Sequence, residues 1–214
     1  MDINHDVIKN FWSKRAAMED ETASRLGDDV RINYDFSLIC QYIDENSTVL
    51  DLGCGNCGLT NKLEPIVKSI VAVDKFDGFL KYCKKSPKIS TVVSDVLEFY
   101  SDNRFDVILI FGVLNYVTRE QALSVYERCK DMLSSDGIMI IKHQMGVSED
   151  VVVNSFSEAL NQNYSASYRH VKQEVIDMEK AGFDVEVVDI YPRKLNKWDN
   201  THHYACICKK KNYL

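Results

Sequence analysis

The chain has 214 residues, of which 45% are hydrophobic and 27% are charged, and its formal net charge is −6 at pH 7. This length suits one compact unit with a substantial core, so we expect residues 1–214 to form a single domain. The acidic balance argues against nucleic acid as a partner, because such partners select a basic face. No apolar run reaches the roughly 18 residues of a membrane span, which argues against a membrane partner as well.

The number of cysteines and the pattern of the first residues indicate the cellular compartment of the protein. The opening stretch "MDINHDVIKNFW" has neither the basic nor the apolar region of a secretory leader. The seven cysteines are an odd number, and a chain of this length does not need disulfides to be stable. We therefore expect reduced thiols and a cytoplasmic protein. The sequence does not indicate an oligomeric state.

Two helical patterns come first in the chain. Residues 5–26 carry Ile8, Phe11 and Trp12 at helical spacing, and residues 31–46 carry a second apolar stripe. From residue 47 onward, strands and helices alternate. The expected strands are 47–52, 69–74, 88–95, 104–114 and 137–144, and the expected helices are 58–67, 78–86 and 118–133.

The strands in this alternation are nearly continuous in Val, Ile and Leu, which is typical of a parallel sheet buried on both faces. Repeated strand–helix–strand units predict a doubly wound α/β fold. The end of the chain differs. We expect a helical stretch over about 148–181, followed by strands at 183–191 and 202–211 with no helix between them. Such a closing pair contains one antiparallel strand.

The stretch "VLDLGCGNCG", residues 49–58, ends the first strand with glycines spaced G-x-G-x-x-G. Ligands of open α/β sheets bind at the carboxyl ends of the strands, and glycines let the backbone approach them closely. A tight turn without a ligand is the alternative. Cys54 and Cys57 also have a C-x-x-C spacing, but no further ligand residues cluster nearby. We therefore expect no metal site.

Three carboxylates at successive strand ends narrow the class of ligand. Asp51 lies two residues before the first glycine, where it would repel a pyrophosphate and attract an ammonium group. Asp74 ends the second strand, where a carboxylate accepts both hydroxyls of a ribose. Asp95 ends the third strand, within reach of an adenine amino group. A ligand with an amino-acid end, a ribose and an adenine fits all three.

At this point the sequence resembles the class I S-adenosylmethionine (SAM)-dependent methyltransferases of the small-molecule type. The resemblance runs from about residue 47 to 143 and rests on "VLDLGCGNCG", "VAVDKF", "VVSDVLEF", "FDVILIFGVLNYV" and "LSSDGIMIIKH" in this order. It implies a Rossmann-like sheet of seven strands, mostly parallel with an antiparallel last strand, and helices on both faces. It also implies that residues 1–46 form an N-terminal helical lid within the domain.

The resemblance assigns roles to particular positions, with SAM as the cofactor and S-adenosylhomocysteine (SAH) as the product. The methionine end of the cofactor, its ribose and its adenine would each meet a separate group of residues. These are Asp51, Gly53, Gly55 and Phe111 for the methionine end, Asp74 for the ribose, and Lys75, Asp95 and Val96 around the adenine.

The turn after the fourth strand, "FGVLNY", bears on the methyl acceptor. It lacks the proline motif of amino-directed nucleic-acid methyltransferases and the acidic metal ligands of catechol-type enzymes. We therefore expect transfer to an oxygen or nitrogen of a polar small molecule, such as a sugar or nucleotide-linked acceptor in carbohydrate biosynthesis. A protein or RNA acceptor and a non-catalytic SAM-binding protein stay open, whereas an NAD-dependent oxidoreductase has less support.

Two residues are candidates for catalysis. His143 ends the fifth strand and would act as general base, although a hydrogen-bonded structural histidine is an equal alternative. Tyr34, in "RINYDF", is the second candidate. His202 and His203 open the last strand, and because neighbouring residues of a strand point to opposite faces, at most one of them faces the cleft.

Basic residues near the expected cleft suggest an anion. Arg15 or Arg31 would meet the carboxylate of the cofactor or an anionic substrate. The segment "YPRKLNKW" adds basic and aromatic residues before the last strand, including Lys197 and Trp198. These would bind a phosphorylated or nucleotide-linked acceptor, or else form a solvated loop.

Overall fold

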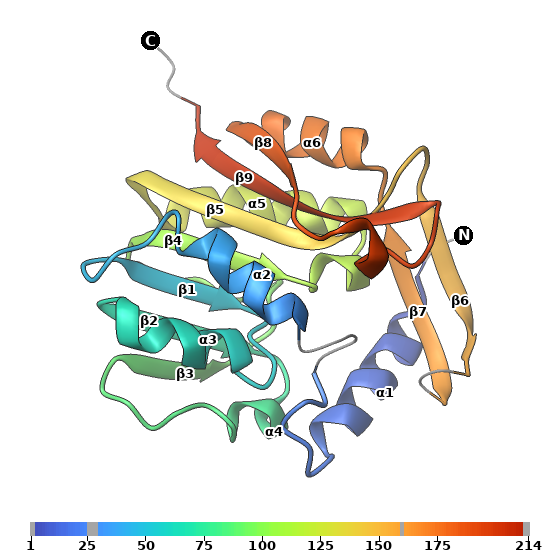
Figure 1. The fold of residues 1–214 in the computed structure, drawn as a ribbon, viewed down its shortest axis with the longest axis horizontal. Helices are drawn as coiled ribbons and strands as arrows, with labels where there is room; N and C mark the ends of the chain where they lie inside the picture. Colours follow the sequence, from blue (N-terminus) through green and yellow to red (C-terminus); the bar gives the residue numbers. More distant parts are fainter. Residues whose placement is uncertain (1–2, 25–29, 159–160, 212–214) are drawn as a thin grey trace.

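The computed structural model describes residues 3–24, 30–158 and 161–211 of the chain. Its main feature is a seven-stranded sheet in the order β3-β2-β1-β4-β5-β9-β8, and a separate two-stranded sheet pairs β6 with β7 (Figure 1). The strands are β1 (Thr48–Leu52), β2 (Ser69–Asp74), β3 (Ile89–Val93), β4 (Phe105–Phe111), β5 (Leu133–Gly146), β6 (Val151–Ser157), β7 (Gln162–Tyr168), β8 (Phe183–Asp189) and β9 (Thr201–Lys210).

The pairing of the strands confirms the predicted topology. The neighbours β3, β2, β1, β4 and β5 run parallel to one another, whereas β9 runs antiparallel to both β5 and β8. A parallel neighbour requires a crossover connection, usually a helix. The segment between β8 and β9 contains only the short 3-10 helix η3 (Arg193–Leu195), so the last strand returns antiparallel.

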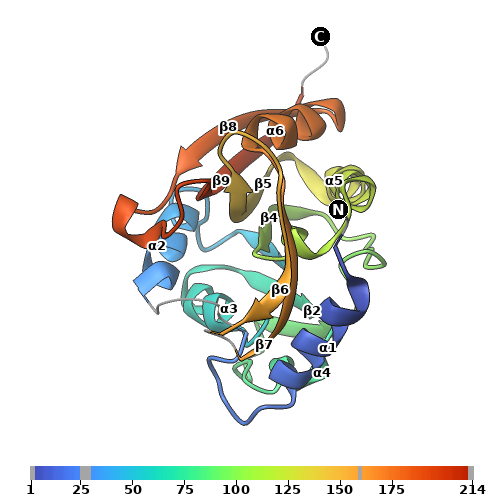
Figure 2. The same cartoon turned by 90° about the vertical axis from the view of Figure 1, so that its right-hand side faces the viewer.

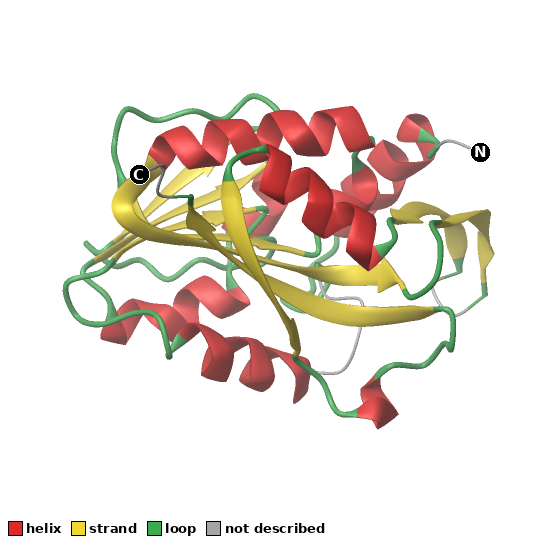
Figure 3. Ribbon diagram, turned by 90° about the horizontal axis from the view of Figure 1, so that it is seen from above, coloured by secondary structure: helices red, strands yellow, loops and turns green. Residues whose placement is uncertain are grey.

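Helices cover both faces of the main sheet (Figure 3). On one face, α5 and α6 pack over a core that includes Leu50, Ile108 and Met139. On the other face, α2 and α3 cover a core that includes Val49 and Leu109. The helices are α1 (His5–Ala16), α2 (Val30–Ile39), α3 (Gly58–Leu63), α4 (Asp77–Leu80), α5 (Arg119–Met132) and α6 (Val171–Lys180), with short 3-10 turns η1 (Glu64–Ile66) and η2 (Leu114–Tyr116).

Local sequence signals explain where α5 begins and which face it buries. Thr118 and Gln121 form a reciprocal capping box, in which the Thr118 hydroxyl accepts from the Gln121 backbone N–H and the Gln121 side chain accepts from the Thr118 backbone N–H. Val125, Cys129 and Met132 lie at helical spacing and are fully buried. This stripe fixes the helix against the sheet and so holds the turn that follows β4.

One element expected from the sequence is wrong. Residues 148–181 do not form a continuous helical stretch, because β6 and β7 make an antiparallel hairpin before α6 begins. The run of three valines that opens β6 has high strand propensity, and alternate side chains of β6 face the pocket described below. Figure 2 shows the hairpin running in front of the main sheet, across β4 and β2.

The N-terminal helix is shorter than expected. It ends at Ala16 rather than continuing to residue 26, and positions 25 and 26 lie outside the described residues. None of the described helices is both long enough and apolar enough to cross a membrane.

Candidate active site

A pocket of about 970 Å³ lies at the carboxyl ends of the parallel strands. All eight residues predicted to hold the cofactor line it, and so does His143. They reach it from β1, β2, β4 and β5 and from the turns that follow β1, β2 and β3. The carboxyl edge of the sheet, where ligands of this architecture bind, is therefore the candidate active site.

The turn after β1 requires glycine at two positions. Gly53 has a φ of +78° and its N–H donates to the Val73 carbonyl over 2.7 Å. Gly55 has a φ of +53° and its N–H donates to Oδ2 of Asp74 over 2.9 Å. Because L-residues with a side chain avoid this left-handed region, the glycines allow the turn to fold back onto the end of β2.

The carboxylate of Asp74 is held by two backbone donors. Its Oδ1 accepts from the Phe76 N–H over 2.9 Å, and its Oδ2 accepts from Gly55. Burial raises the pKa of Asp74, while these backbone hydrogen bonds act in the opposite direction. A carboxylate has about four acceptor sites in all. The side chain is thus fixed in orientation and still able to accept further hydrogen bonds.

Asp51 lies deeper in the pocket, at the end of β1. Its Oδ2 accepts from the Thr60 hydroxyl over 2.6 Å, and only 2% of the residue is exposed. Burial raises the pKa of Asp51 to about 6, with the hydrogen bond from Thr60 opposing that shift. A cationic ligand would stabilise the ionised form of a carboxylate this buried, because its positive charge compensates the hydration that the carboxylate has lost.

The third predicted carboxylate, Asp95, follows β3 and pairs with a lysine. The Lys75 ammonium lies 2.6 Å from Oδ2 of Asp95, and the Leu97 N–H donates to Oδ1 over 3.0 Å. The next residue, Val96, is half-buried at the same rim of the pocket. The structure thus brings Lys75, Asp95 and Val96 together beside Asp74.

Helix α1 and strand β7 cover the pocket together with η2. The rings of Phe11 and Tyr164 meet edge to face with centroids 5.4 Å apart, and those of Trp12 and Tyr116 do so at 5.2 Å. The hydroxyls of Tyr116 and Tyr164 lie 3.0 Å apart, and those of Tyr164 and Tyr168 lie 3.3 Å apart. Sequence reasoning expected an N-terminal cover but missed the hairpin, which supplies the two tyrosines of β7.

The opposite wall of the pocket consists of charged and aromatic residues. The Lys142 ammonium lies 3.1 Å from Oδ2 of Asp35, whose Oδ1 accepts from the Tyr191 hydroxyl over 2.7 Å. Burial is the largest single effect and would lower the pKa of Lys142, but Asp35 and Tyr191 together outweigh it and raise the pKa to about 12. Sequence reasoning expected basic and aromatic residues of "YPRKLNKW", which begins with Tyr191, near the cleft but did not single out Lys142 or Asp35. The available signal was a lysine near the end of the otherwise apolar run "GIMIIKHQ".

His143 adjoins the pocket, but its side chain has no exposed surface. Burial lowers its pKa to about 4, so the imidazole is neutral at neutral pH and its 3.6 Å contact with Glu174 is not an ion pair there. Neither ring nitrogen has a hydrogen-bond partner among the described residues. A role as general base therefore stays a prediction.

A buried network anchors the wall behind His143. The Arg169 guanidinium donates to Glu174 from Nε over 2.5 Å and to the Leu114 carbonyl from Nη1 over 2.8 Å. The Tyr126 hydroxyl donates to the same Glu174 carboxylate. Burial would raise the pKa of Glu174, but Arg169, with smaller contributions from His143 and Tyr126, lowers it to about 2. This network ties η2 to α6 and so positions the tyrosine of η2 over the pocket.

The other expected site residues divide into two groups. Arg31 and His203 line the pocket, and so do Lys197 and Trp198. The expectation that at most one of the paired histidines faces the cleft is thus confirmed. Residues that do not line it are Tyr34, Arg15 and His202. The ring of Tyr34 packs edge to face against Tyr191 at 6.0 Å, and a catalytic role for Tyr34 stays a prediction without a contact to support it.

The cysteines of the glycine turn are free thiols. The sulfur atoms of Cys54 and Cys57 lie 3.8 Å apart, at hydrogen-bond distance, and do not form a disulfide. The hydrogen bond between the two thiols, together with burial, raises the pKa of Cys54. Within the described ranges, no group of three or more His, Cys, Asp or Glu residues is arranged to hold a metal ion.

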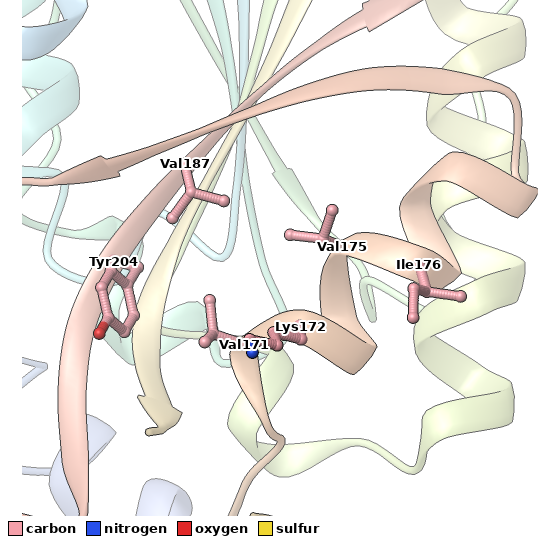
Figure 4. Close-up of a pocket in the computed structure, with 6 residues that line it drawn as sticks. All are labelled: Val171, Lys172, Val175, Ile176, Val187 and Tyr204. Carbon is pink, nitrogen blue, oxygen red and sulfur yellow. The ribbon is translucent and has the colours of Figure 1, made fainter. Parts of the chain in front are cut away.

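A second hollow, of about 370 Å³, lies between α6 and strands β8 and β9 (Figure 4). Val175, Val187 and Tyr204 are among the side chains that line it. Of the described residues in this lining, Lys172 is the charged one and none supplies a carboxylate for a ribose or an ammonium group. The pocket at the carboxyl ends of the strands is therefore the better candidate for a cofactor site.

The strand order and the pocket define a Rossmann-like α/β domain with its site at the carboxyl edge of the sheet. Comparison with known proteins is consistent with this class. Residues 49–137 match the family model described as "Methyltransferase domain". The structure superimposes on a complex of DhpI with SAH at a TM-score of 0.74, with 12% identity, covering 98% of this chain and 100% of that one.

Two curated relatives are similar in sequence. "Putative methyltransferase 235L" of Invertebrate iridescent virus 6 is 29% identical over 116 residues, which is 53% of this chain and 43% of the viral protein. "N-terminal Xaa-Pro-Lys N-methyltransferase 1-B" of Xenopus laevis is 27% identical over 150 residues, covering 63% of this chain and 67% of the relative. The chain thus spans less than half the length of the viral relative.

The match over residues 49–137 to the methyltransferase domain confirms the resemblance to SAM-dependent methyltransferases seen in the sequence, with SAM as the cofactor that these enzymes use.

Proposed function

We propose that the chain is a SAM-dependent methyltransferase that transfers a methyl group to an oxygen or nitrogen of a polar small molecule. The observation that carries this proposal is the Asp74 carboxylate, which lines the pocket, is oriented by two backbone N–H groups and has acceptor sites beyond these two. A ribose offers two adjacent hydroxyl donors to such a group. The electrophilic methyl belongs to the cofactor, so the protein has to bind it and align the acceptor.

The remaining predicted residues would orient the cofactor from both ends. The buried Asp51 would compensate the ammonium group of its methionine portion, and Gly53 and Gly55 would let the backbone approach that portion. The rim formed by Lys75, Asp95 and Val96 would flank the adenine, and Phe111 would line the pocket near the sulfonium. These assignments form one proposal, because a single elongated ligand has to reach all of them.

The cover over the pocket supports a small acceptor. Helix α1 and the β6–β7 hairpin both contribute lining residues, among them Trp12, Ser155 and Tyr164. A protein N-terminus, the acceptor named for the Xenopus relative, would have to enter beneath this cover. We therefore propose a small acceptor first, with sugars and nucleotide-linked compounds included, and a peptide terminus second. Residues 1–46 would serve as part of the lid.

Besides aligning the acceptor with the methyl group, the protein can supply a general base that removes a proton from the acceptor. His143 is neutral, and neither of its ring nitrogens has a hydrogen-bond partner among the described residues, so its unprotonated nitrogen is able to accept a proton if the acceptor reaches it. A pKa of about 4 makes it a weak base, however. We expect an amine acceptor, which can lose its proton to water before the transfer, to depend little on His143, and a hydroxyl acceptor to depend on it more.

The test is acceptor-dependent formation of SAH. The protein is incubated with SAM and pools of amines, sugars, sugar nucleotides and a short peptide with a free N-terminus, and SAH is quantified by mass spectrometry. The proposal predicts SAH formation with a small-molecule pool and none without acceptor. Turnover with the peptide alone would favour the second acceptor class. Tight SAM binding without turnover in any pool would favour a non-catalytic binding protein.

A further inference from the structure

Two cationic side chains meet the same aromatic ring at one end of the pocket. The Lys142 ammonium, near the end of β5, lies 5.6 Å from the centroid of the Tyr191 ring, and the Arg31 guanidinium, on α2, lies 5.5 Å from it. Both residues line the pocket. Two positive charges in one partly dehydrated region favour a negatively charged ligand unless nearby carboxylates neutralise both of them.

One carboxylate compensates one of these cations. Asp35 lies 3.1 Å from the Lys142 ammonium. Among the described residues, no carboxylate lies within ion-pair distance of Arg31, whose Nη2 donates to the Leu195 carbonyl over 2.6 Å. The Nε of Arg31 is buried, and no residue in the described part of the chain accepts its hydrogen bond. This end of the pocket thus has an uncompensated charge and an unused donor.

The neighbouring histidine adds no charge. The Oδ1 of Asn196 accepts from the backbone N–H of His203 over 2.9 Å and lies 3.3 Å from its ring Nδ1. Because that oxygen accepts, the proton of the neutral ring belongs on Nδ1 and Nε2 is left as an acceptor. Burial, followed by the charges of Lys142 and Arg31, lowers the pKa of His203 to about 3. The positive field here therefore comes from the lysine and the arginine.

This cationic end lies beside the position proposed for the reacting methyl group. Phe111 and Lys142 are register partners on β4 and β5, and the Lys142 ammonium lies 5.0 Å from the centroid of the Phe111 ring. The glycine turn and Asp51 approach the same pocket from β1. A compound held at Arg31 and Lys142 would therefore be close to the sulfonium rather than at the adenine end.

We propose that the methyl acceptor carries an anionic group, a carboxylate or a phosphate, that binds between Arg31 and Lys142. This inference rests on the proposed function and narrows its acceptor class from polar molecules to acids. The Arg31 Nε would donate to the anion, and the Lys142 ammonium would add charge while it stays paired with Asp35. The carboxylate of the cofactor itself is the competing occupant, and the experiment separates the two.

The experiment is a titration of inorganic phosphate, and separately of acetate, into the SAH complex, followed by calorimetry. The variants are Arg31→Gln and the matched control Arg193→Gln, which removes the same charge from an exposed position outside the pocket. We expect phosphate or acetate to bind the wild-type complex, with about tenfold weaker binding in Arg31→Gln, as expected for one lost charge-assisted hydrogen bond. The control and the SAH affinity of both variants should stay within about twofold of wild type.

Three results would overturn the inference. An SAH affinity that falls about tenfold in Arg31→Gln would assign the arginine to the carboxylate of the cofactor. Equal anion binding by wild type and Arg31→Gln, or none by either, would remove the subsite.

If Arg31→Gln melts at a lower temperature than the control, Arg31→Lys replaces it, and full anion affinity in that variant would contradict a role for Nε. If SAH itself does not bind, the proposed function fails, while the same titration of the free protein still tests the subsite.

Discussion

The backbone N–H of Gly55 donates to Oδ2 of Asp74 over 2.9 Å, so the first turn of the fold is joined to the end of the second strand. Residues 19 positions apart in the chain thereby form one unit. The carboxylate is oriented before any ligand arrives, which reduces the cost of ordering it on binding.

Replacement of Asp74 should reduce cofactor affinity more than any other single change at the adenosine end. Asp74→Ala removes the proposed acceptor of both ribose hydroxyls and leaves the Gly55 N–H without its partner. Two hydrogen bonds to a charged group correspond to a loss of at least about 100-fold in SAH affinity by calorimetry. The control is Asp77→Ala, an exposed aspartate on α4 outside the pocket lining. Equal affinities for the two variants would remove Asp74 from the ribose site.

The affinity for SAH should depend on pH through Asp51. Its pKa is about 6 because it is buried, so the carboxylate becomes neutral as the pH falls below that value and no longer compensates an ammonium group. We expect SAH affinity to be constant above pH 7 and to fall by up to about tenfold per pH unit below pH 6. Asp51→Asn should bind weakly with a flat profile over this range. A wild-type profile as flat as that of the Asp51→Asn variant would contradict the role proposed for the carboxylate.

Much of this site was predictable from the sequence because its residues follow strands. The apolar runs of β1, β2, β3 and β4 locate the strand ends, and Asp51, Asp74 and Asp95 lie at or directly after them. Parallel strands then bring these positions to one edge without further information. The eight predicted cofactor residues therefore line one pocket, although their contacts with a cofactor stay a prediction.

The acceptor side was not predictable in the same way. Asp35, Lys142 and Tyr191 come from three distant parts of the chain, and their hydrogen bonds depend on how α2 packs beside the last strands. The sequence predicts a helix where the β6–β7 hairpin lies, because the polar residues of the hairpin obscure the alternation of a strand. Its strand character depends on packing against α1, where Phe11 meets Tyr164.

The stability of the turn should depend on Gly53 more than on Gly112, although both have a positive φ. A Cβ at Gly53 would lie 2.1 Å from Cγ2 of Val113, whereas a Cβ at Gly112 would meet nothing within 4 Å. Gly53→Ala should lower the free energy of unfolding by about 2–5 kcal/mol, and Gly112→Ala by about 1–2 kcal/mol. Urea unfolding measures both values.

The double variant Gly53→Ala with Val113→Ala tests the cause of that loss. It removes the methyl group that the new Cβ would strike, so it should recover part of the stability lost in the single variant. Additive losses in the double variant would show that the clash is not the reason.

His143 should make the stability of the protein depend on mildly acidic pH. Its pKa is about 4 in the folded protein and near 6.5 when unfolded, so the unfolded chain binds more protons between these values. Stability from this residue is complete above pH 6.5 and is lost as the pH falls toward 4, by up to about 1.4 kcal/mol per pH unit. His143→Gln should therefore show a shallower loss than wild type in this window. The exposed His5→Gln serves as control and should follow wild type.

The most direct measurement is a crystal structure of the protein with SAH bound. The account predicts both ribose hydroxyls within hydrogen-bond distance of the Asp74 carboxylate, the adenine beside Asp95 and Val96, and the ammonium group directed to Asp51. SAH bound in another part of the molecule, or in this pocket with its ribose away from Asp74, would contradict it.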